Sequence, residues 1–189
     1  MGSGKSTVCH ILAACGAPVY VADDRAKVLL NNDPSLRQGV LTLFGPNAYN
    51  NDEMLNRAHL ARRAFADPSL LEQLNALVHP AVQQDFAVWR ALVSPNAPFL
   101  VKEAAIMLEA DTVADLDVVV LVYAPKSLRL QRTMTRDGAS ESNVLARMSR
   151  QWSDQRKINE VDYVVYNDGR HLVIPQVLHF LHRYFKRNL

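Results

Sequence analysis

The sequence has 189 residues, of which 49% are hydrophobic and 21% charged, with a formal net charge of +2. This length suits one domain, with room for an inserted subdomain, and can bury a substantial core. So mild a charge gives no argument for a nucleic-acid or membrane-surface partner, and none is expected. The longest apolar run, VVVLVYA (118–124), is too short to span a bilayer. Cys9 and Cys15 have neither CxxC spacing nor the pattern of a disulfide framework, which favours a cytoplasmic protein.

The chain opens with MGSGKST (1–7), which supplies the end of the phosphate-loop pattern G-x-x-x-x-G-K-[ST]. Small residues let backbone N–H groups surround phosphate oxygens, and the start of the following helix adds its positive end. Lys5 is expected to reach the β- and γ-phosphates, and the Ser6 hydroxyl to ligate Mg²⁺. The predicted ATP-binding residues of this loop are Gly2, Ser3, Gly4, Lys5, Ser6 and Thr7.

Four short segments rich in β-branched residues predict buried strands, at 18–23, 99–104, 118–124 and 162–167. Helical patterns separate these segments, which favours a parallel sheet covered by helices on both faces. The first helix is predicted from Lys5 to Cys15, ending at Gly16. We therefore predict an α/β fold with a doubly wound parallel sheet.

Two excursions leave this predicted core. Residues 24–97 are strongly helical and too long for a simple crossover, so we interpret them as a helical insert; Asp67 and Pro68 are predicted as N-cap and N1 of one of its helices. Residues 126–157 are polar and rich in arginine, with a turn at Asp137-Gly138, as expected of a lid. The core of this single domain is then formed by residues 1–23, 98–125 and 158–189.

Asp23 is predicted as the last residue of the strand 18–23. Ligands of open α/β sheets bind beyond the carboxyl ends of the strands, so its carboxylate is expected to face the cleft. There it could accept the proton of an attacking hydroxyl or hold a magnesium-bound water. The alternative is that Asp23 caps the next helix, but Asp24 is equally placed for that task.

Arg129, Arg132 and Arg136 share one face of a predicted helix, and no acidic residue interrupts that stripe in the sequence. Like charges at this spacing destabilise a helix unless an anion meets them. Guanidinium groups suit the charge of a transferred phosphate, so we predict that Arg132 and Arg136 contact phosphate. The alternative is a solvated basic face.

For two further residues, His79 and Glu103, the sequence allows two roles each. His79 precedes Pro80 within a helical pattern, and the proline predicts that its imidazole is held at a bend. There it either touches substrate or forms a structural hydrogen bond. Glu103 lies at the end of the second predicted strand, where it either faces the cleft near Mg²⁺ or is a buried, paired carboxylate.

The motifs MGSGKST, VYVADDRAK, LNALVHPAV, AAIMLEA, LQRTMTRD and VDYVVYNDG resemble those of dephospho-CoA kinases in order and spacing, over essentially the whole chain. The resemblance implies a three-layer P-loop kinase that transfers the ATP γ-phosphate, with Mg²⁺, to the 3′-hydroxyl of dephospho-CoA. It also implies that Lys5, Asp23 and Arg132 are catalytic. His79, in the insert, matches the region that binds the CoA side.

The sequence departs from that family at two places. Val21 stands where a second aspartate is usual, and residues 105–109 read AIMLE in place of P-L-L-F-E. Substrate contacts inferred from this stretch, Ile106 among them, rest on the resemblance alone. The alternative functions are another small-molecule P-loop kinase or a non-catalytic ATP-binding remnant. The oligomeric state is left open, with a monomer favoured.

The pattern of the phosphate loop places its first glycine two residues before Met1. The resemblance further implies that a strand feeding this loop lies between the strands at 99–104 and 118–124. Without that strand, backbone groups of both neighbours lose their partners. We therefore expect the sequence to be a truncated record, whose native chain begins about ten residues earlier with an apolar strand.

Overall fold

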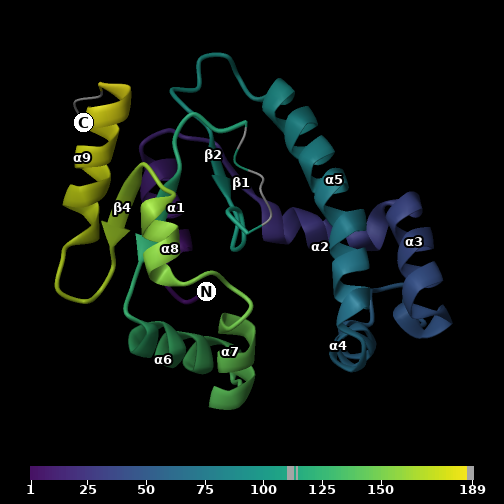
Figure 1. Cartoon of the computed structure of the whole chain (residues 1–189). Coiled ribbons are helices and arrows are strands. Elements are labelled where there is room, and N and C mark those ends of the chain that lie inside the picture. The colour runs from purple at the N-terminus through teal and green to yellow at the C-terminus, as the bar shows by residue number, and fades with distance from the viewer. Residues whose placement is uncertain (110–112, 114, 187–189) are drawn as a thin grey trace. The chain divides into compact units, whose positions relative to one another are not determined.

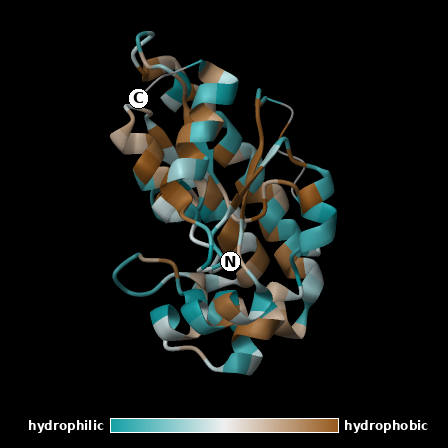
Figure 2. Cartoon of the chain, turned by 90° about the vertical axis from the view of Figure 1, so that its left-hand side faces the viewer, coloured by the Kyte–Doolittle hydropathy of each residue, from teal (hydrophilic) through white to brown (hydrophobic). Residues whose placement is uncertain are grey.

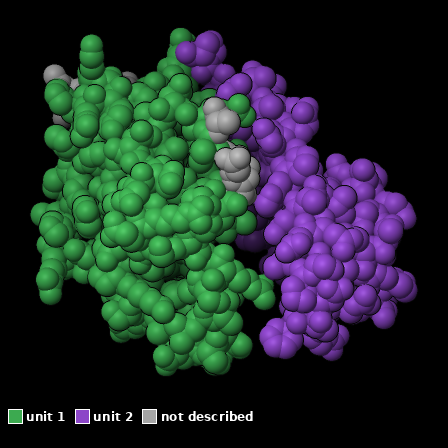
Figure 3. Space-filling model, viewed as in Figure 1, with its two compact units in different colours: residues 1–19, 96–189 green, residues 20–95 purple. Residues whose placement is uncertain are grey.

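The computed structural model describes residues 1–109, 113 and 115–186 (Figure 1). The chain divides into two compact units, each with a hydrophobic core of its own (Figure 3). Unit 1 comprises residues 1–19 and 96–189, and unit 2 comprises residues 20–95. Within the described ranges, none of the helices combines the length and the apolar character needed to cross a membrane.

The four predicted strands are confirmed, each shorter than expected: β1 (Val19–Val21), β2 (Val101–Glu103), β3 (Val120–Tyr123) and β4 (Tyr163–Tyr166). They form two two-stranded sheets, β1 with β2 and β3 with β4. The second pair is parallel, in a register that joins Val120 to Tyr163 and Tyr123 to Tyr166. The chain is therefore α/β with parallel pairing, whereas one continuous doubly wound sheet stays a prediction.

Helix α1 (Lys5–Ala14) begins directly after the phosphate loop and ends as predicted. Gly16 takes a φ of +91°, a conformation that favours glycine. Its N–H donates to the Ala13 carbonyl, and the N–H of Ala17 donates to the Leu12 carbonyl. This pair of bonds is the Schellman arrangement, which stops the helix and turns the chain into β1.

The core of unit 1 lies between α1, the β3–β4 pair and α9 (Val173–Phe185), whose hydrophobic residues are brown in Figure 2. It is formed by Val8, Leu12, Ala17, Val122, Val165, Val177, Phe180 and Leu181. The remaining helices of the unit are α6 (Lys126–Asp137), α7 (Glu141–Met148) and α8 (Asp154–Asn159). The predicted turn at Asp137-Gly138 is confirmed, because Gly138 ends α6 with a φ of +60°.

Unit 2 is helical apart from its share of β1. Its elements are α2 (Ala22–Asn32), α3 (Pro34–Phe44), the 3-10 helix η1 (Pro46–Ala48), α4 (Arg57–Ala66) and α5 (Pro68–Leu92). The core contains Val40, Phe44, Ala48, Leu60 and Leu70. The predicted start of α5 is confirmed, since the Asp67 carboxylate caps it by accepting from the Ser69 N–H at 3.0 Å.

The prediction that Pro80 interrupts a helix is wrong, because α5 continues through it for 25 residues in all. A proline inside a helix removes one backbone hydrogen bond and costs about 3 kcal/mol. Packing of α5 against α2, α3 and α4 outweighs this cost. His79 is thus a helical residue, and its imidazole is half-buried.

Candidate phosphate-binding site

The phosphate loop depends on two glycines with positive φ. Gly2 has a φ of +69° and Gly4 one of +94°. A Cβ atom on Gly2 would come within 2.5 Å of the Arg129 carbonyl oxygen, and one on Gly4 would overlap the Asn167 amide. Both the backbone conformation and the available space therefore require glycine here. The loop leads into the first turn of α1, whose free N–H groups attract anions.

Asn167, the residue after β4, forms hydrogen bonds that join the phosphate loop to the end of β3. Its Nδ2 donates to the Ser3 carbonyl at 2.8 Å, and its backbone N–H donates to the Tyr123 carbonyl at 2.7 Å. Ser3 is buried. In the sequence, Asn167 is noted only as part of the motif VDYVVYNDG, with no role assigned to it. A polar residue at the carboxyl end of a parallel strand is the signal that could have identified it.

Lys5 lies in the first turn of α1 and faces the end of β2. Its Nζ is 3.7 Å from Oε1 of Glu103, and the two side chains are 26% and 11% exposed. Glu103 is therefore a largely buried carboxylate paired with the loop lysine, which is the second of its two predicted positions. Burial and the negative charge of Glu103 raise the pKa of the Cys9 thiol to about 11, so this thiol stays neutral at physiological pH.

Positive charge gathers around the beginning of the loop. The charged side chains of Lys5, Arg129 and Lys157 all lie close enough to Met1 for their charges to act at that position. The hydroxyl-bearing residues Ser6 and Thr7 are exposed in the first turn of α1. Cations and helix N–H groups at one place favour a bound anion.

Arg132 of α6 reaches the same place. Its Nη1 donates to the backbone carbonyl of Asn167 at 3.1 Å. The α6 helix also contacts the loop through Thr133, which is fully buried and lies close to Gly2. Unit 1 thus brings together the predicted residues Gly2, Ser3, Gly4, Lys5 and Arg132.

The expectation that the arginine stripe has no acidic partners is wrong for two of its members. Arg129 forms two hydrogen bonds with the Asp154 carboxylate, at 2.7 and 2.9 Å. Arg136 donates to Asp137 at 2.7 Å, and the hydrogen bond holds the pKa of that carboxyl below its usual value. Asp154 lies 25 residues beyond Arg129 in the chain. A pattern read along one helix therefore could not reveal it.

The predicted substrate residues are in both units. Ile106 is half-buried in unit 1, in the loop that follows β2. Asp23 and His79 belong to unit 2. Asp23 is not the last residue of a strand, because β1 ends at Val21 and Asp23 lies, exposed, in the first turn of α2. The carboxylate of Asp24 pairs with Lys27 one turn further along that helix.

In the part of the chain that the structure describes, His, Cys, Asp and Glu side chains form no group of three that could hold a metal ion. A magnesium ion bound through phosphate oxygens needs no such group, because it keeps several waters and takes one or two protein ligands. The exposed Ser6 hydroxyl is a donor of that kind.

Comparison with known proteins gives one consistent family. The family model for dephospho-CoA kinase matches residues 1–172. A dephospho-CoA kinase of Bacteroides fragilis is 34% identical over 96% of this chain and 87% of its own length. The corresponding enzyme of Chlorobaculum tepidum is 38% identical, over 89% of this chain and 83% of its own.

Solved structures share the fold of this chain. The crystal structure of a protein from Thermus thermophilus has 32% sequence identity and superposes with a TM-score of 0.84, covering 97% of this chain and 92% of that one. A dephospho-CoA kinase from Campylobacter jejuni superposes with a TM-score of 0.70, over 100% of this chain and 95% of its own. At 22% identity, that second likeness concerns the fold alone.

Proposed function

Because this chain belongs to the dephospho-CoA kinase family, we propose that it transfers the γ-phosphoryl group of ATP to the 3′-hydroxyl of dephospho-CoA. The products are CoA and ADP. The observation that carries the proposal is the phosphate loop of unit 1, whose left-handed glycines and Lys5 open helix α1. Family membership supplies the acceptor, since a phosphate loop alone is shared by many nucleotide-binding proteins.

The donor side of the reaction falls to unit 1. Gly2, Ser3, Gly4 and Thr7 surround the phosphates, and Lys5 leaves Glu103 to meet the β- and γ-oxygens. Ser6 would hold a magnesium ion that accompanies ATP, and the ion would supply charge neutralisation at the transferred group. Arg132 stabilises the equatorial oxygens of the transferred phosphoryl group. To do so, its guanidinium gives up its hydrogen bond to the Asn167 carbonyl and donates to phosphate instead. Arg136 contributes at the nucleotide in the same way, once released from Asp137.

For the acceptor substrate we propose roles for Asp23, Ile106 and His79. Asp23 accepts the proton of the 3′-hydroxyl as that oxygen bonds to phosphorus and the bond to the β-phosphate oxygen breaks. Ile106 and His79 contact dephospho-CoA. In this proposal the chain is one three-layer P-loop kinase domain, with the helical insert at 24–97 and the lid at 126–157. The compactness of residues 20–95 supports the insert.

Direct product analysis tests the function. The protein with MgATP and dephospho-CoA should release ADP and form CoA, identified by mass. Nucleosides and shikimate in place of dephospho-CoA should give background release only. Release with shikimate or a nucleoside instead would favour another small-molecule kinase, and ATP binding without transfer to any acceptor would favour a non-catalytic module. We place this activity in a monomer in the cytoplasm, with no nucleic-acid or membrane partner.

A further inference from the structure

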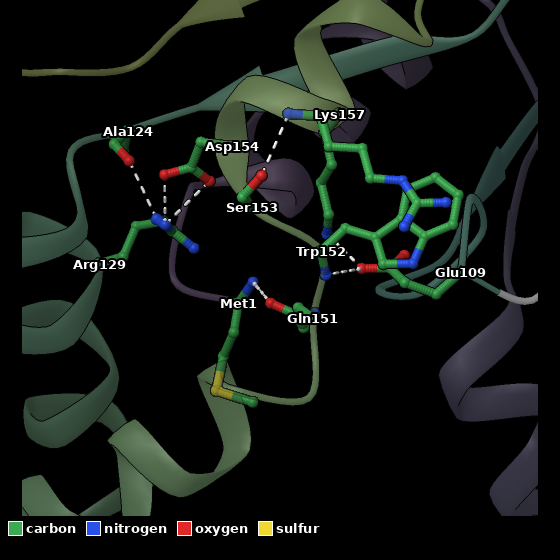
Figure 4. A network of polar contacts seen from close by, with 10 residues as sticks. Met1, Glu109, Ala124, Arg129, Gln151, Trp152, Ser153, Asp154 and Lys157 are labelled. Atoms are coloured by element: carbon green, nitrogen blue, oxygen red, sulfur yellow. Dashed lines mark hydrogen bonds and ion pairs between the residues drawn. The ribbon is translucent and has the colours of Figure 1, made fainter.

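The segment 151–157, termed the anchor segment, connects three parts of unit 1 that lie far apart in the sequence (Figure 4). The side chain of Gln151 donates to the Ala105 carbonyl at 3.1 Å and accepts from the Met1 nitrogen at 3.2 Å. Asp154 holds Arg129 at the start of α6. The anchor segment therefore touches the phosphate loop, the arginine helix and the loop that follows β2.

Glu109 makes two further connections to the anchor segment. Its Oε1 accepts the backbone N–H of Trp152 at 3.0 Å and lies 2.6 Å from Nζ of Lys157. The two charged side chains are only 12% and 11% exposed. A pair so well shielded from water is poorly screened by salt, and loss of one partner leaves the other buried without compensation. Glu109 thus fixes its own loop firmly to the anchor segment.

This loop, residues 104–109, is fixed at both ends. Glu103 comes just before this segment and contacts Lys5 of the phosphate loop, and Glu109 is the last residue of its described part. Ile106, the proposed substrate contact, lies between the two attachments. The position of Ile106 relative to the phosphate loop is therefore set by Glu103 and the Gln151–Ala105 bond on one side and by Glu109 on the other.

We propose that Glu109 is a positioning residue for dephospho-CoA, a proposal that rests on the function proposed above. Glu109 does not touch the reacting atoms. It acts through Lys157 and the Trp152 N–H to hold the acceptor loop in place. Glu109 reaches the phosphate loop only through the anchor segment, whereas it belongs to the same stretch of chain as Ile106. Loss of Glu109 should therefore affect the acceptor substrate more than the nucleotide.

The test is Glu109→Gln, which keeps an oxygen for the Trp152 N–H but removes the charge that faces Lys157. The KM for dephospho-CoA should rise about tenfold or more, while kcat and the KM for ATP change by less than about threefold. Glu160→Gln, the same change at an exposed residue three positions beyond Lys157, is the matched control.

An unchanged KM for dephospho-CoA would overturn the positioning role, and so would an equal rise in both KM values. Calorimetric titration with dephospho-CoA separates this proposal from the proposed function. A parent protein that binds dephospho-CoA but does not phosphorylate it contradicts the function. The comparison of Kd between parent and Glu109→Gln still decides the role of Glu109 in that case. A parent that does not bind dephospho-CoA contradicts both.

Discussion

Asn167 supports the phosphate loop through one donated hydrogen bond, from Nδ2 to the Ser3 carbonyl at 2.8 Å. In Asn167→Asp the donor becomes a charged acceptor facing another acceptor, so the Kd for MgATP should rise about tenfold or more. Asn167→Ala removes the donor without adding charge and should weaken binding in the same direction. Calorimetry measures both, with Asn143→Asp at an exposed site as control. An ATP affinity equal to the parent's in both variants would contradict this role.

Asp23 is the proposed general base. Asp23→Asn keeps the size of the side chain but cannot accept a proton, so kcat should fall about 10²-fold or more. ATP affinity should stay close to the parent value. Asp24→Asn is the matched control, because it makes the same change at the adjacent residue, which pairs with Lys27. Steady-state kinetics and ATP titration measure the two effects, and equal turnover of Asp23→Asn and parent would remove Asp23 from the mechanism.

At the scale of elements, Asp85 of α5 joins its helix to α2 and to the end of β1. It accepts hydrogen bonds from Arg25 Nε at 2.8 Å and from the Tyr20 hydroxyl at 2.7 Å. The Arg25 hydrogen bond is the larger cause that lowers the pKa of Asp85 from 3.8, and the Tyr20 bond adds to it. The carboxylate is therefore more stable in the folded protein than in the unfolded chain.

This shift gives a pH dependence with a definite sign. Above about pH 4 the stabilisation is fully present, and it is lost as the pH falls through the lowered pKa. Asp85→Asn should reduce the free energy of unfolding at pH 7 by about 1 kcal/mol, since Arg25 is well exposed and the pair is screened. The variant should also lose less stability than the parent between pH 5 and pH 3. Urea titrations across this range measure both, and parallel curves would contradict the assignment.

The elements themselves were largely predictable. Strands β1 to β4, the stop at Gly16 and the cap at Asp67 all follow from local residue chemistry, and all are found. The interpretation of His79-Pro80 as a bend was wrong because it rested on the local preference of proline alone. The contacts of α5 with its neighbouring helices were not visible in the sequence. Tertiary packing of a long amphipathic helix outweighs a single lost hydrogen bond.

For the molecule as a whole, the phosphate loop was predictable and its supports were not. Residues that touch phosphate follow a fixed spacing along the chain. The partners that hold them do not, since Asn167 is 164 residues from Ser3, and Gln151 is 46 from Ala105. Arg129 and Asp154 are also separated in the sequence, by 25 residues, so their contact could not be predicted from a local pattern. Such pairs form only when strands and helices pack together in the fold. No short stretch of the sequence reveals that packing.

The separate cores of the two units lead to a prediction for the whole chain. Phe44 is 1% exposed in the core of unit 2, and the core of unit 1 is centred on Val177 and Leu181. Phe44→Ala leaves a cavity and should destabilise unit 2 by about 3–5 kcal/mol. Hydrogen exchange followed by mass spectrometry should then show faster exchange in residues 20–95, while peptides around Leu181 keep the parent rate.

Phe65→Ala is the matched control, because this phenylalanine of the same unit is 83% exposed and should change stability by less than about 0.5 kcal/mol. Saturating MgATP adds a second readout. A ligand stabilises the part of a protein that binds it, so ATP should slow exchange in α1 and α6 and leave the core of unit 2 unchanged. If Phe44→Ala instead accelerates exchange around Leu181 as much as in residues 20–95, the two cores open together. The chain would then fold as a single cooperative unit.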